Sequence, residues 1–355
     1  MRVDLGALVP VFGPTTVRGG GLGLAVCPAL CLLVTSCKER DCLEVFKLAK
    51  DAFTGAAYQG AVGALTQLCT LSSTSSEPGG GMWFKFRDGD GTGFLAFTDA
   101  DSPCPHLLLA TDAGQDAVHV IDVVGRAHVG FVAPPGTIAG PRGVAARGSL
   151  VAVSAWKEYS SGDHVVHVFE GSRASWTAVR VVAGGFGGPG SADGQLHGPF
   201  GLRFVGIGSE LGLVVADVGS GNVSMFRVQH GSFVRHLATD LCVPHDVEEC
   251  EGGWLVACAG SDTVEFVGGG APVASRNQLG QRGTGVTVPV QFRFPSALAL
   301  VPGLGLVVRE SIGGRIHCFV DPDAIAMSAM SACRVSWMVA VMRGVHHRLV
   351  THATV

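Results

Sequence analysis

Hydrophobic and polar positions between residues 190 and 228 predict three short strands joined by tight turns. Pro199 opens the first, in the segment Pro-Phe-Gly-Leu. The apolar run Leu211–Asp217 predicts a strand buried on both faces, and the alternating segment Asn222–Val228 predicts a third. Glycine, serine and aspartate fill the connections, as is typical of tight turns. The unit therefore predicts a small antiparallel sheet.

The same three-strand pattern recurs five more times along the chain. In this unit, which is the fourth along the chain and is called the template unit below, the second strand ends near Asp217, and the equivalent positions in the other units are Ser36, Asp112, Ala155, Cys258 and Glu310. Further strand-like segments follow four of the units and fit an outer fourth strand: Ala64–Leu71, Ala127–Ala133, Ala178–Ala183 and Phe233–Thr239. In the fifth unit the signal for this strand is faint, around Val273. A unit of three or four strands that recurs along the chain indicates one sheet per repeat unit.

The motif that opens the template unit resembles an NHL repeat. Its residues are Gly190, Gly194-Gln195-Leu196 and Pro199-x-Gly201, followed by Val-Ala-Asp and a hairpin. The resemblance covers about Gly20–Val320 and implies an all-β fold, a six-bladed β-propeller of four-stranded antiparallel blades. The family's Asp-x-x-Asn-x-Arg turn is present only as Asp217 with Asn222, without the arginine. Functions of the NHL family that depend on this turn are therefore not expected of this chain.

Both ends of the chain depart from the repeat. The sixth unit has no outer strand after Val320, and the unassigned segment Leu5–Phe12 is predicted to pair antiparallel with Arg315–Val320 and close the ring. Pro10 is compatible with an outermost strand, which pairs on one side only. The propeller is thus assigned to residues 1–322. Asp321-Pro322-Asp323 predicts a helix start, so 323–355 is assigned to a C-terminal helix and a disordered tail.

Composition narrows the class of protein. Glycine accounts for 52 of 355 residues, which suits many tight turns, and charged residues make up only 15% with a net charge of −4. A strongly electrostatic nucleic-acid binder would carry a basic excess. Eleven cysteines, an odd number, favour a reducing, cytoplasmic location. The apolar segment Leu22–Ser36 aligns with the repeat and is read as part of a blade rather than as a signal segment. Arg334 interrupts the apolar C-terminal stretch, so a membrane span is not expected.

Two patterns resemble metal sites, but the predicted strands argue against both. Cys27, Cys31, Cys37 and Cys42 have zinc-like spacing, but the strand assignment places them at opposite ends of a strand, about 17–20 Å apart. The segment from Asp88 to Asp99 follows the spacing of an EF-hand loop, but its flanks predict strands instead of helices. An exposed polar hairpin is the main interpretation there, and weak Ca²⁺ binding is the alternative. No cofactor is predicted, and no Gly-x-Ser-x-Gly, His-Glu-x-x-His or phosphate-loop motif is present.

The candidate binding residues follow the blade-opening prolines. The resemblance implies that this position faces the central opening of the ring, and its occupants are Arg142, Phe200, His245 and Ser296. An arginine, an aromatic ring and a histidine on one rim could grip a peptide or stack nucleic-acid bases. Read individually, Phe200 could be a core residue and His245 could bond to a neighbouring backbone.

The leading hypothesis is a non-catalytic binding or scaffold module for a protein or peptide partner on the top face, where these residues lie. The alternatives are a metal-dependent hydrolase or lyase with its site in the central channel, and single-stranded RNA binding.

Overall fold

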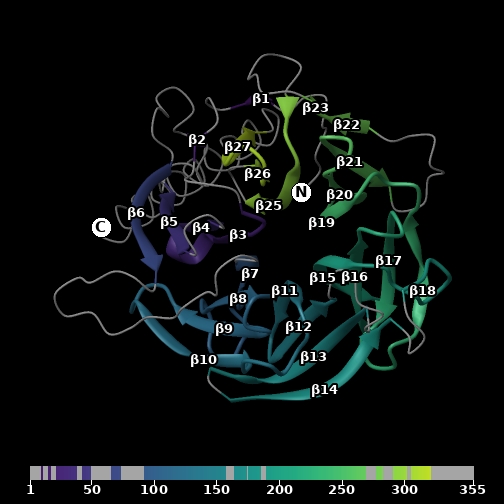
Figure 1. Ribbon diagram of the computed structural model, residues 1–355, viewed down its shortest axis with the longest axis horizontal. Coiled ribbons are helices and arrows are strands. Elements are labelled where there is room, and N and C mark those ends of the chain that lie inside the picture. The colour runs from purple at the N-terminus through teal and green to yellow at the C-terminus, as the bar shows by residue number, and fades with distance from the viewer. Residues whose placement is uncertain are drawn as a thin grey trace, which may run out of the picture.

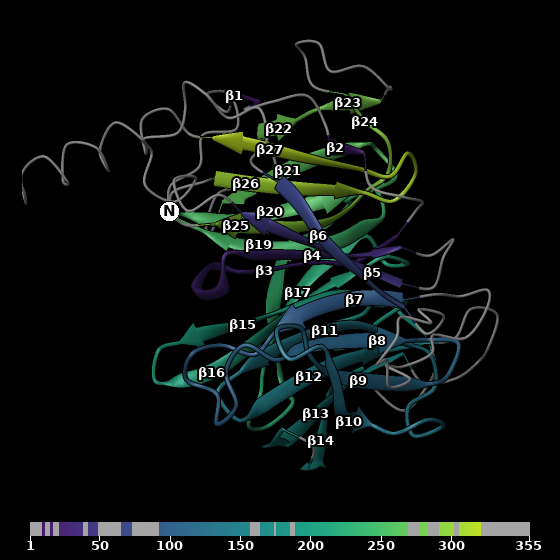
Figure 2. The ribbon, with the colours of Figure 1, turned by 90° about the vertical axis from the view of Figure 1, so that its left-hand side faces the viewer.

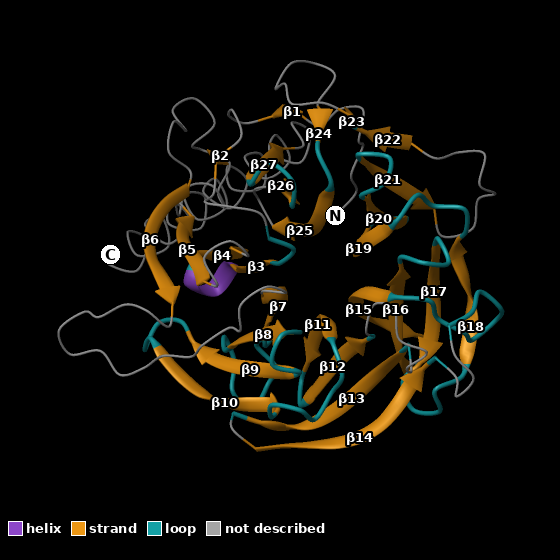
Figure 3. Cartoon of the chain, in the orientation of Figure 1, coloured by secondary structure: helices purple, strands orange, loops and turns teal. Residues whose placement is uncertain are grey.

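Six small antiparallel sheets are arranged like blades around a central axis (Figure 1). This computed structural model describes residues 9–10, 15–16, 21–37, 42–48, 65–72, 92–156, 164–173, 175–184, 189–268, 277–282, 291–301 and 305–320. Strands dominate these residues, and a short 3-10 helix, η1 (Pro28–Leu30), lies between the first two strands of blade one (Figure 3). The all-β, six-bladed fold class predicted from the repeat is confirmed.

Blades one to five each contain four strands that follow one another in the chain, and the sheet of blade six contains five. Blade one contains β3 (Leu24–Cys27), β4 (Leu32–Cys37), β5 (Cys42–Leu48) and β6 (Leu65–Ser72). Blade two contains β7 (Thr92–Phe97), β8 (Leu108–Asp112), β9 (Ala117–Asp122) and β10 (Ala127–Ala133). Blade three contains β11 (Pro141–Arg147), β12 (Leu150–Ala155), β13 (Val165–Ser172) and β14 (Ser175–Ala183).

The second half of the ring repeats this order. Blade four contains β15 (Pro199–Ile207), β16 (Glu210–Asp217), β17 (Asn222–Arg227) and β18 (Phe233–Ala238). Blade five contains β19 (Pro244–Cys250), β20 (Gly253–Cys258), β21 (Thr263–Gly268) and β22 (Asn277–Leu279). Blade six contains β25 (Pro295–Val301), β26 (Gly305–Glu310) and β27 (Arg315–Val320), completed from the N-terminal region. A short parallel pair, β23 (Gln281–Arg282) and β24 (Gln291–Phe292), connects blades five and six.

The hydrophobic core is divided into six clusters, each filling the space between two neighbouring blades. Successive residues of a strand point to opposite faces of its sheet, so each inner blade face packs on a different neighbour. Val215 packs towards blade three and Val214 towards blade five. This explains why the second strand of each unit is a continuous apolar run instead of an alternating one.

The ring is closed by strand pairing between the two ends of the described chain. β1 (Val9–Pro10) pairs antiparallel with β27, with Val9 opposite Val320 and Pro10 opposite Phe319. β2 (Thr15–Thr16) pairs with the other end of β27 (Figure 2). The remaining residues of Leu5–Phe12 lie outside those described, as do the predicted C-terminal helix and the domain boundary at 322. In blade five, the outer strand is at Asn277–Leu279, and Val273 is outside the described residues.

Removing residues 1–18 is expected to destabilise the protein by about 2–3 kcal/mol, because the ladder hydrogen bonds of β1 and β2 to β27 are lost and β27 becomes an exposed edge. The measurement is denaturant unfolding together with light scattering for aggregation. A deletion of residues 1–8, which keeps β1 and β2, serves as the control. Equal stability of the two deletions would contradict closure by these strands.

Candidate functional site

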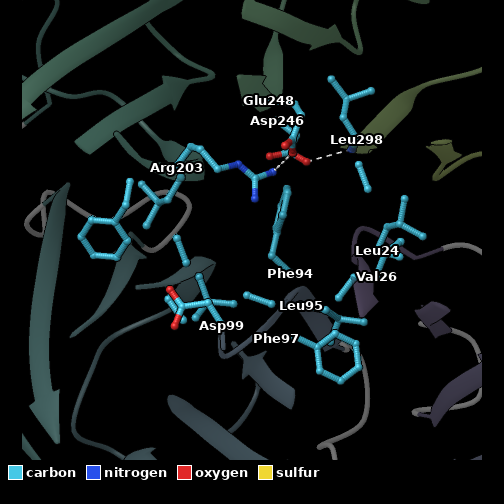
Figure 4. Close-up of a pocket in the computed structure, with 18 of the residues that line it drawn as sticks. Leu24, Val26, Phe94, Leu95, Phe97, Asp99, Arg203, Asp246, Glu248 and Leu298 are labelled. Carbon is cyan, nitrogen blue, oxygen red and sulfur yellow. Dashed lines mark hydrogen bonds and ion pairs between the residues drawn. The ribbon is translucent and has the colours of Figure 1, made fainter. Parts of the chain in front are cut away.

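A central cavity of about 510 Å³ lies inside the ring (Figure 4). The inner strands of all six blades contribute to its lining: β3, β7, β11, β15, β19 and β25. Most lining residues follow the start of these strands by two positions or more, and the lining continues to Asp99 and Asp101 in the loop after β7. The cavity therefore extends to the end of the ring at which the inner strands finish. The opposite end, where Pro141, Pro199, Pro244 and Pro295 open the inner strands, is called the proline end below.

The wall of the cavity is mixed: polar atoms make up more of its exposed surface than apolar atoms, and the apolar part comes from the inner strands. Phe94, Leu95 and Phe97 from β7 lie on one side of it, and Leu24, Val26 and Leu298 lie around them (Figure 4). These are the residues that the repeat places on inner strands, where side chains either join the clusters between blades or face the axis. A cavity of this size falls within the range of small-molecule sites.

Three charged side chains form a polar corner in this wall. Arg203 on β15 forms an ion pair with Glu248 on β19, and its Nε donates to the carbonyl oxygen of Val247 at 3.4 Å. Asp246 accepts a hydrogen bond from the backbone N–H of Leu298 on β25, at 2.9 Å, and another from Val247 N–H, also at 2.9 Å (Figure 4). The corner thus links blades four, five and six through side chains.

Two carboxylates share one guanidinium in the polar corner, and both remain protonated to unusually high pH. Burial raises the pKa of Asp246 to about 6, although Arg203 and the two backbone N–H groups oppose this. Burial likewise raises the pKa of Glu248 to about 7, against the attraction of Arg203 and with the help of the neighbouring charge of Asp246. Near neutral pH the two carboxylates are therefore only partly ionised, and the corner becomes more negative as the pH rises above 7.

Asp99, Asp101 and Arg147 are the other charged residues that line the cavity. The Asp99 carboxylate accepts the backbone N–H of Gly148 at 3.0 and 3.1 Å, which fixes its position between blades two and three. Asp101 and Arg147 are exposed. With Asp246, Glu248 and Arg203 included, four acidic and two basic side chains line the cavity, so its lining is net acidic.

The four residues predicted from the blade-opening prolines lie at the proline end and do not line the cavity. Arg142 is half-buried, and its guanidinium carbon lies 5.2 Å from the centre of the Trp156 ring. Trp156 is also half-buried and contacts Phe200, with ring centres 5.7 Å apart. A cation over an indole face is a favourable arrangement.

Phe200 and His245 are buried next to each other behind this pair, with ring centres 4.6 Å apart. Phe294 packs on the other side of His245 at 4.9 Å. Burial, together with the nearby positive charge of Arg142, lowers the pKa of His245 to about 3, so the imidazole is neutral at physiological pH. Its Nδ1 atom is buried and has no hydrogen-bond partner among the residues that the structure describes.

Ser296 lies apart from these three residues. It is fully buried, and its hydroxyl donates to the carbonyl oxygens of Gly21 and Arg309, both at 3.4 Å. It therefore joins blades six and one. Thr111 and Ser154 act similarly, since their hydroxyls donate to the carbonyl oxygens of Arg142 and Phe200 in the next blade at 2.7 and 2.8 Å.

Glycine is required beside these bonds because neighbouring inner strands approach closely. A Cβ at Gly143 would clash with the carbonyl oxygen of Phe200, and one at Gly201 would clash with the backbone of His245 and Asp246. The Pro-x-Gly spacing of the repeat therefore reflects blade-to-blade contact at the proline end.

The two sequence patterns that resemble metal sites are the four cysteines and the EF-hand-like segment. Cys27 and Cys31 lie at one end of β4, whereas Cys37 and Cys42 face each other at its other end, as the strand assignment predicts. Residues 88–91 lie outside those described, and Thr92 begins β7. Among the described residues, no group of three or more His, Cys, Asp or Glu side chains is placed to hold a metal ion.

Sequence reasoning did not select the polar corner or Trp156. One signal was available for the corner: Asp246 and Glu248 are two residues apart on an inner strand of an otherwise weakly charged protein. The partner Arg203, on a different blade, has no such signal.

Comparisons with known proteins identify the fold. No protein-family model and no curated protein sequence matches this chain. A chain in the crystal structure of the nidogen/laminin complex matches with a TM-score of 0.50 and 15% identity, over 76% of this chain and 81% of that chain. The fold is a six-bladed β-propeller. A protein from Lactobacillus plantarum matches with a TM-score of 0.48 and 18% identity, over 76% of this chain and 71% of its own.

In the part of the propeller that the structure describes, no helix is long and apolar enough to cross a membrane.

Proposed function

We propose that this chain is a non-catalytic NHL-type propeller that acts as a binding or scaffold module, with a protein or peptide partner bound at the proline end. The observation that carries this proposal is the Arg142–Trp156 pair. Both side chains are half-buried, and the exposed His197 lies close by, because its ring is 5.6 Å from that of His164, which stacks on Trp156. Arginine and tryptophan are the residue types most enriched among side chains that dominate protein interfaces.

Buried residues behind the Arg142–Trp156 pair hold the proposed binding surface in place before a partner binds. Phe200 packs against the Trp156 ring, with the ring centres 5.7 Å apart. The buried Nδ1 atom of His164 accepts a hydrogen bond from the backbone N–H of Gly198 at 2.7 Å. A surface held in place by packing loses little conformational entropy when a partner binds.

The NHL assignment is supported by the structural role of each motif position in blade four. Leu196 is buried in the cluster between blades three and four, and Pro199 opens the inner strand β15. The Asp217 carboxylate accepts the backbone N–H of His197 at 2.8 and 2.9 Å, and it also accepts the Ser220 hydroxyl. The motif thus fixes the turn that leads into the inner strand.

The test is affinity capture from cell extract followed by quantitative mass spectrometry. We expect that Arg142→Ala/Trp156→Ala lowers recovery of the specific partner at least tenfold, because a typical interface depends on a few such side chains. The matched control is Arg173→Ala/Trp176→Ala, which removes the same residue types from the outer edge of blade three. Both proteins must show wild-type melting temperatures.

Other outcomes would overturn the proposal. Equal recovery of every partner by the two double variants removes the proline end as the binding surface. Retention of random single-stranded RNA at moderate salt, lost only in Arg142→Ala/Trp156→Ala, would assign the surface to RNA instead. Stoichiometric zinc or calcium in the purified protein, together with metal-dependent hydrolysis or lyase activity, would favour the enzyme alternative.

A further inference from the structure

The central cavity has features that the binding surface at the proline end does not use. It is about 510 Å³ in volume, and its wall combines the apolar residues of β7 and β25 with the polar corner of Arg203, Asp246 and Glu248 (Figure 4). A cavity of this volume suits a small molecule better than a folded partner.

Charge decides which small molecule would be preferred. The lining is net acidic, and Arg203 is already occupied by its ion pair with Glu248 and by the Val247 carbonyl. Asp246 is buried and uses its oxygens on two backbone N–H groups. In contrast, only one oxygen of Glu248, Oε2, takes part in a described hydrogen bond, and the side chain is 15% exposed. A carboxylate oxygen next to the apolar part of the wall therefore remains to accept a donor.

We propose that the central cavity binds a small primary amine with an apolar body, whose ammonium group donates to Glu248 and whose body packs against the partly exposed Val26, Phe97 and Leu300. An ammonium group supplies both the missing positive charge and the missing donors. An anionic ligand would instead face the excess of carboxylates. A neutral ligand of the same shape would gain only the apolar contact.

Three compounds of similar shape test the choice of charge: 2-phenylethylamine, 2-phenylethanol and phenylacetate. Titration calorimetry or ligand-observed NMR on the full-length protein is expected to give the order amine, alcohol, carboxylate, with the amine at least tenfold tighter than the alcohol. Equal affinity of amine and alcohol, or preferential binding of phenylacetate, would overturn the proposal, and so would the absence of amine binding at millimolar concentration.

Glu248→Gln keeps the shape of the side chain and removes its charge. It is expected to weaken 2-phenylethylamine at least tenfold and to leave 2-phenylethanol unchanged. The matched control is Glu210→Gln, since Glu210 is also ion-paired, with Arg227 at 2.6 Å, but does not line the cavity. A wild-type affinity for the amine in Glu248→Gln would place the ammonium elsewhere.

A second variant keeps the proposal testable if Glu248→Gln folds poorly. Ala299 lines the cavity, so Ala299→Phe fills part of the volume without touching the ion pair, and it is expected to abolish binding of both amine and alcohol. Unchanged binding of both compounds to this variant would place them outside the cavity.

The pH dependence of binding provides an independent readout. The charged groups that act on Glu248 are Arg203, Asp246 and Glu249. Because burial raises the pKa of Glu248 to about 7, the carboxylate loses its proton between pH 6 and 8, while a primary amine stays protonated. Amine affinity should therefore rise about tenfold from pH 6 to pH 8 and alcohol affinity should stay constant. A flat profile for the amine would exclude a role for this carboxylate.

Discussion

Val215→Asp is expected to yield no soluble, folded protein. Val215 is fully buried in the middle of β16, opposite Leu202 on one side and Ser224 on the other, and it belongs to the core between blades three and four. An aspartate there would be a buried carboxylate with no cation beside it, which costs several kcal/mol, a large part of the 5–15 kcal/mol that stabilises a typical domain. The soluble fraction after expression and circular dichroism of any recovered protein measure the effect.

The same substitution at an exposed valine is the control. Val124 is 66% exposed in the turn between β9 and β10, and Val124→Asp should express and melt like the wild type. If Val215→Asp folds normally, Val215 is not buried in the core between blades three and four.

Arg309→Ala is expected to destabilise the protein by about 3–5 kcal/mol. Arg309 on β26 is fully buried, and its Nη2 donates to the carbonyl oxygen of Ser36 in blade one at 3.3 Å. Burial lowers the pKa of Arg309 to about 10, against the attraction of Glu44, which is also buried. Removal of the guanidinium would take away a positive charge that attracts the buried Glu44 carboxylate. Urea unfolding monitored by tryptophan fluorescence provides the measurement.

A double-mutant cycle separates this charge effect from simple loss of packing. Arg309→Met should be nearly as destabilising as Arg309→Ala, and Arg309→Met/Glu44→Gln should recover about 1–3 kcal/mol of that loss. The control is Arg227→Ala, since the Arg227–Glu210 pair is about 40% exposed and should contribute less than about 1 kcal/mol. Additive effects of Arg309→Met and Glu44→Gln would show that the two groups do not interact.

The sequence predicts most of the fold because the repeat is local. β10 and β27 have the predicted bounds, since each is delimited by turn residues that are read within a few positions. The outer strand β22 is three residues long and pairs on one side only, so its pattern is weak and its position was predicted poorly.

The site is less accessible to sequence reasoning because it depends on contacts between blades. The position after each blade-opening proline was expected to face the opening, yet Phe200, His245 and Ser296 are all buried there. Their burial follows from the close approach of neighbouring inner strands, which no single repeat encodes. Similarly, Arg203 pairs with Glu248 across two blades, and the pairing depends on how much each blade is rotated relative to the next.

Closure by β1, β2 and β27 also has a consequence for the order of folding. The blades from one to five are built from neighbouring segments, whereas Val9 must find Val320 at the opposite end of the described chain. Closing so long a loop costs entropy that local hairpins do not lose, and contacts between distant residues slow folding. During synthesis, the earlier blades would emerge from the ribosome while β1 and β2 still lack their partner. The nascent chain would therefore pass through an open, incomplete ring, and this is the stage at which aggregation or chaperone binding would compete with folding.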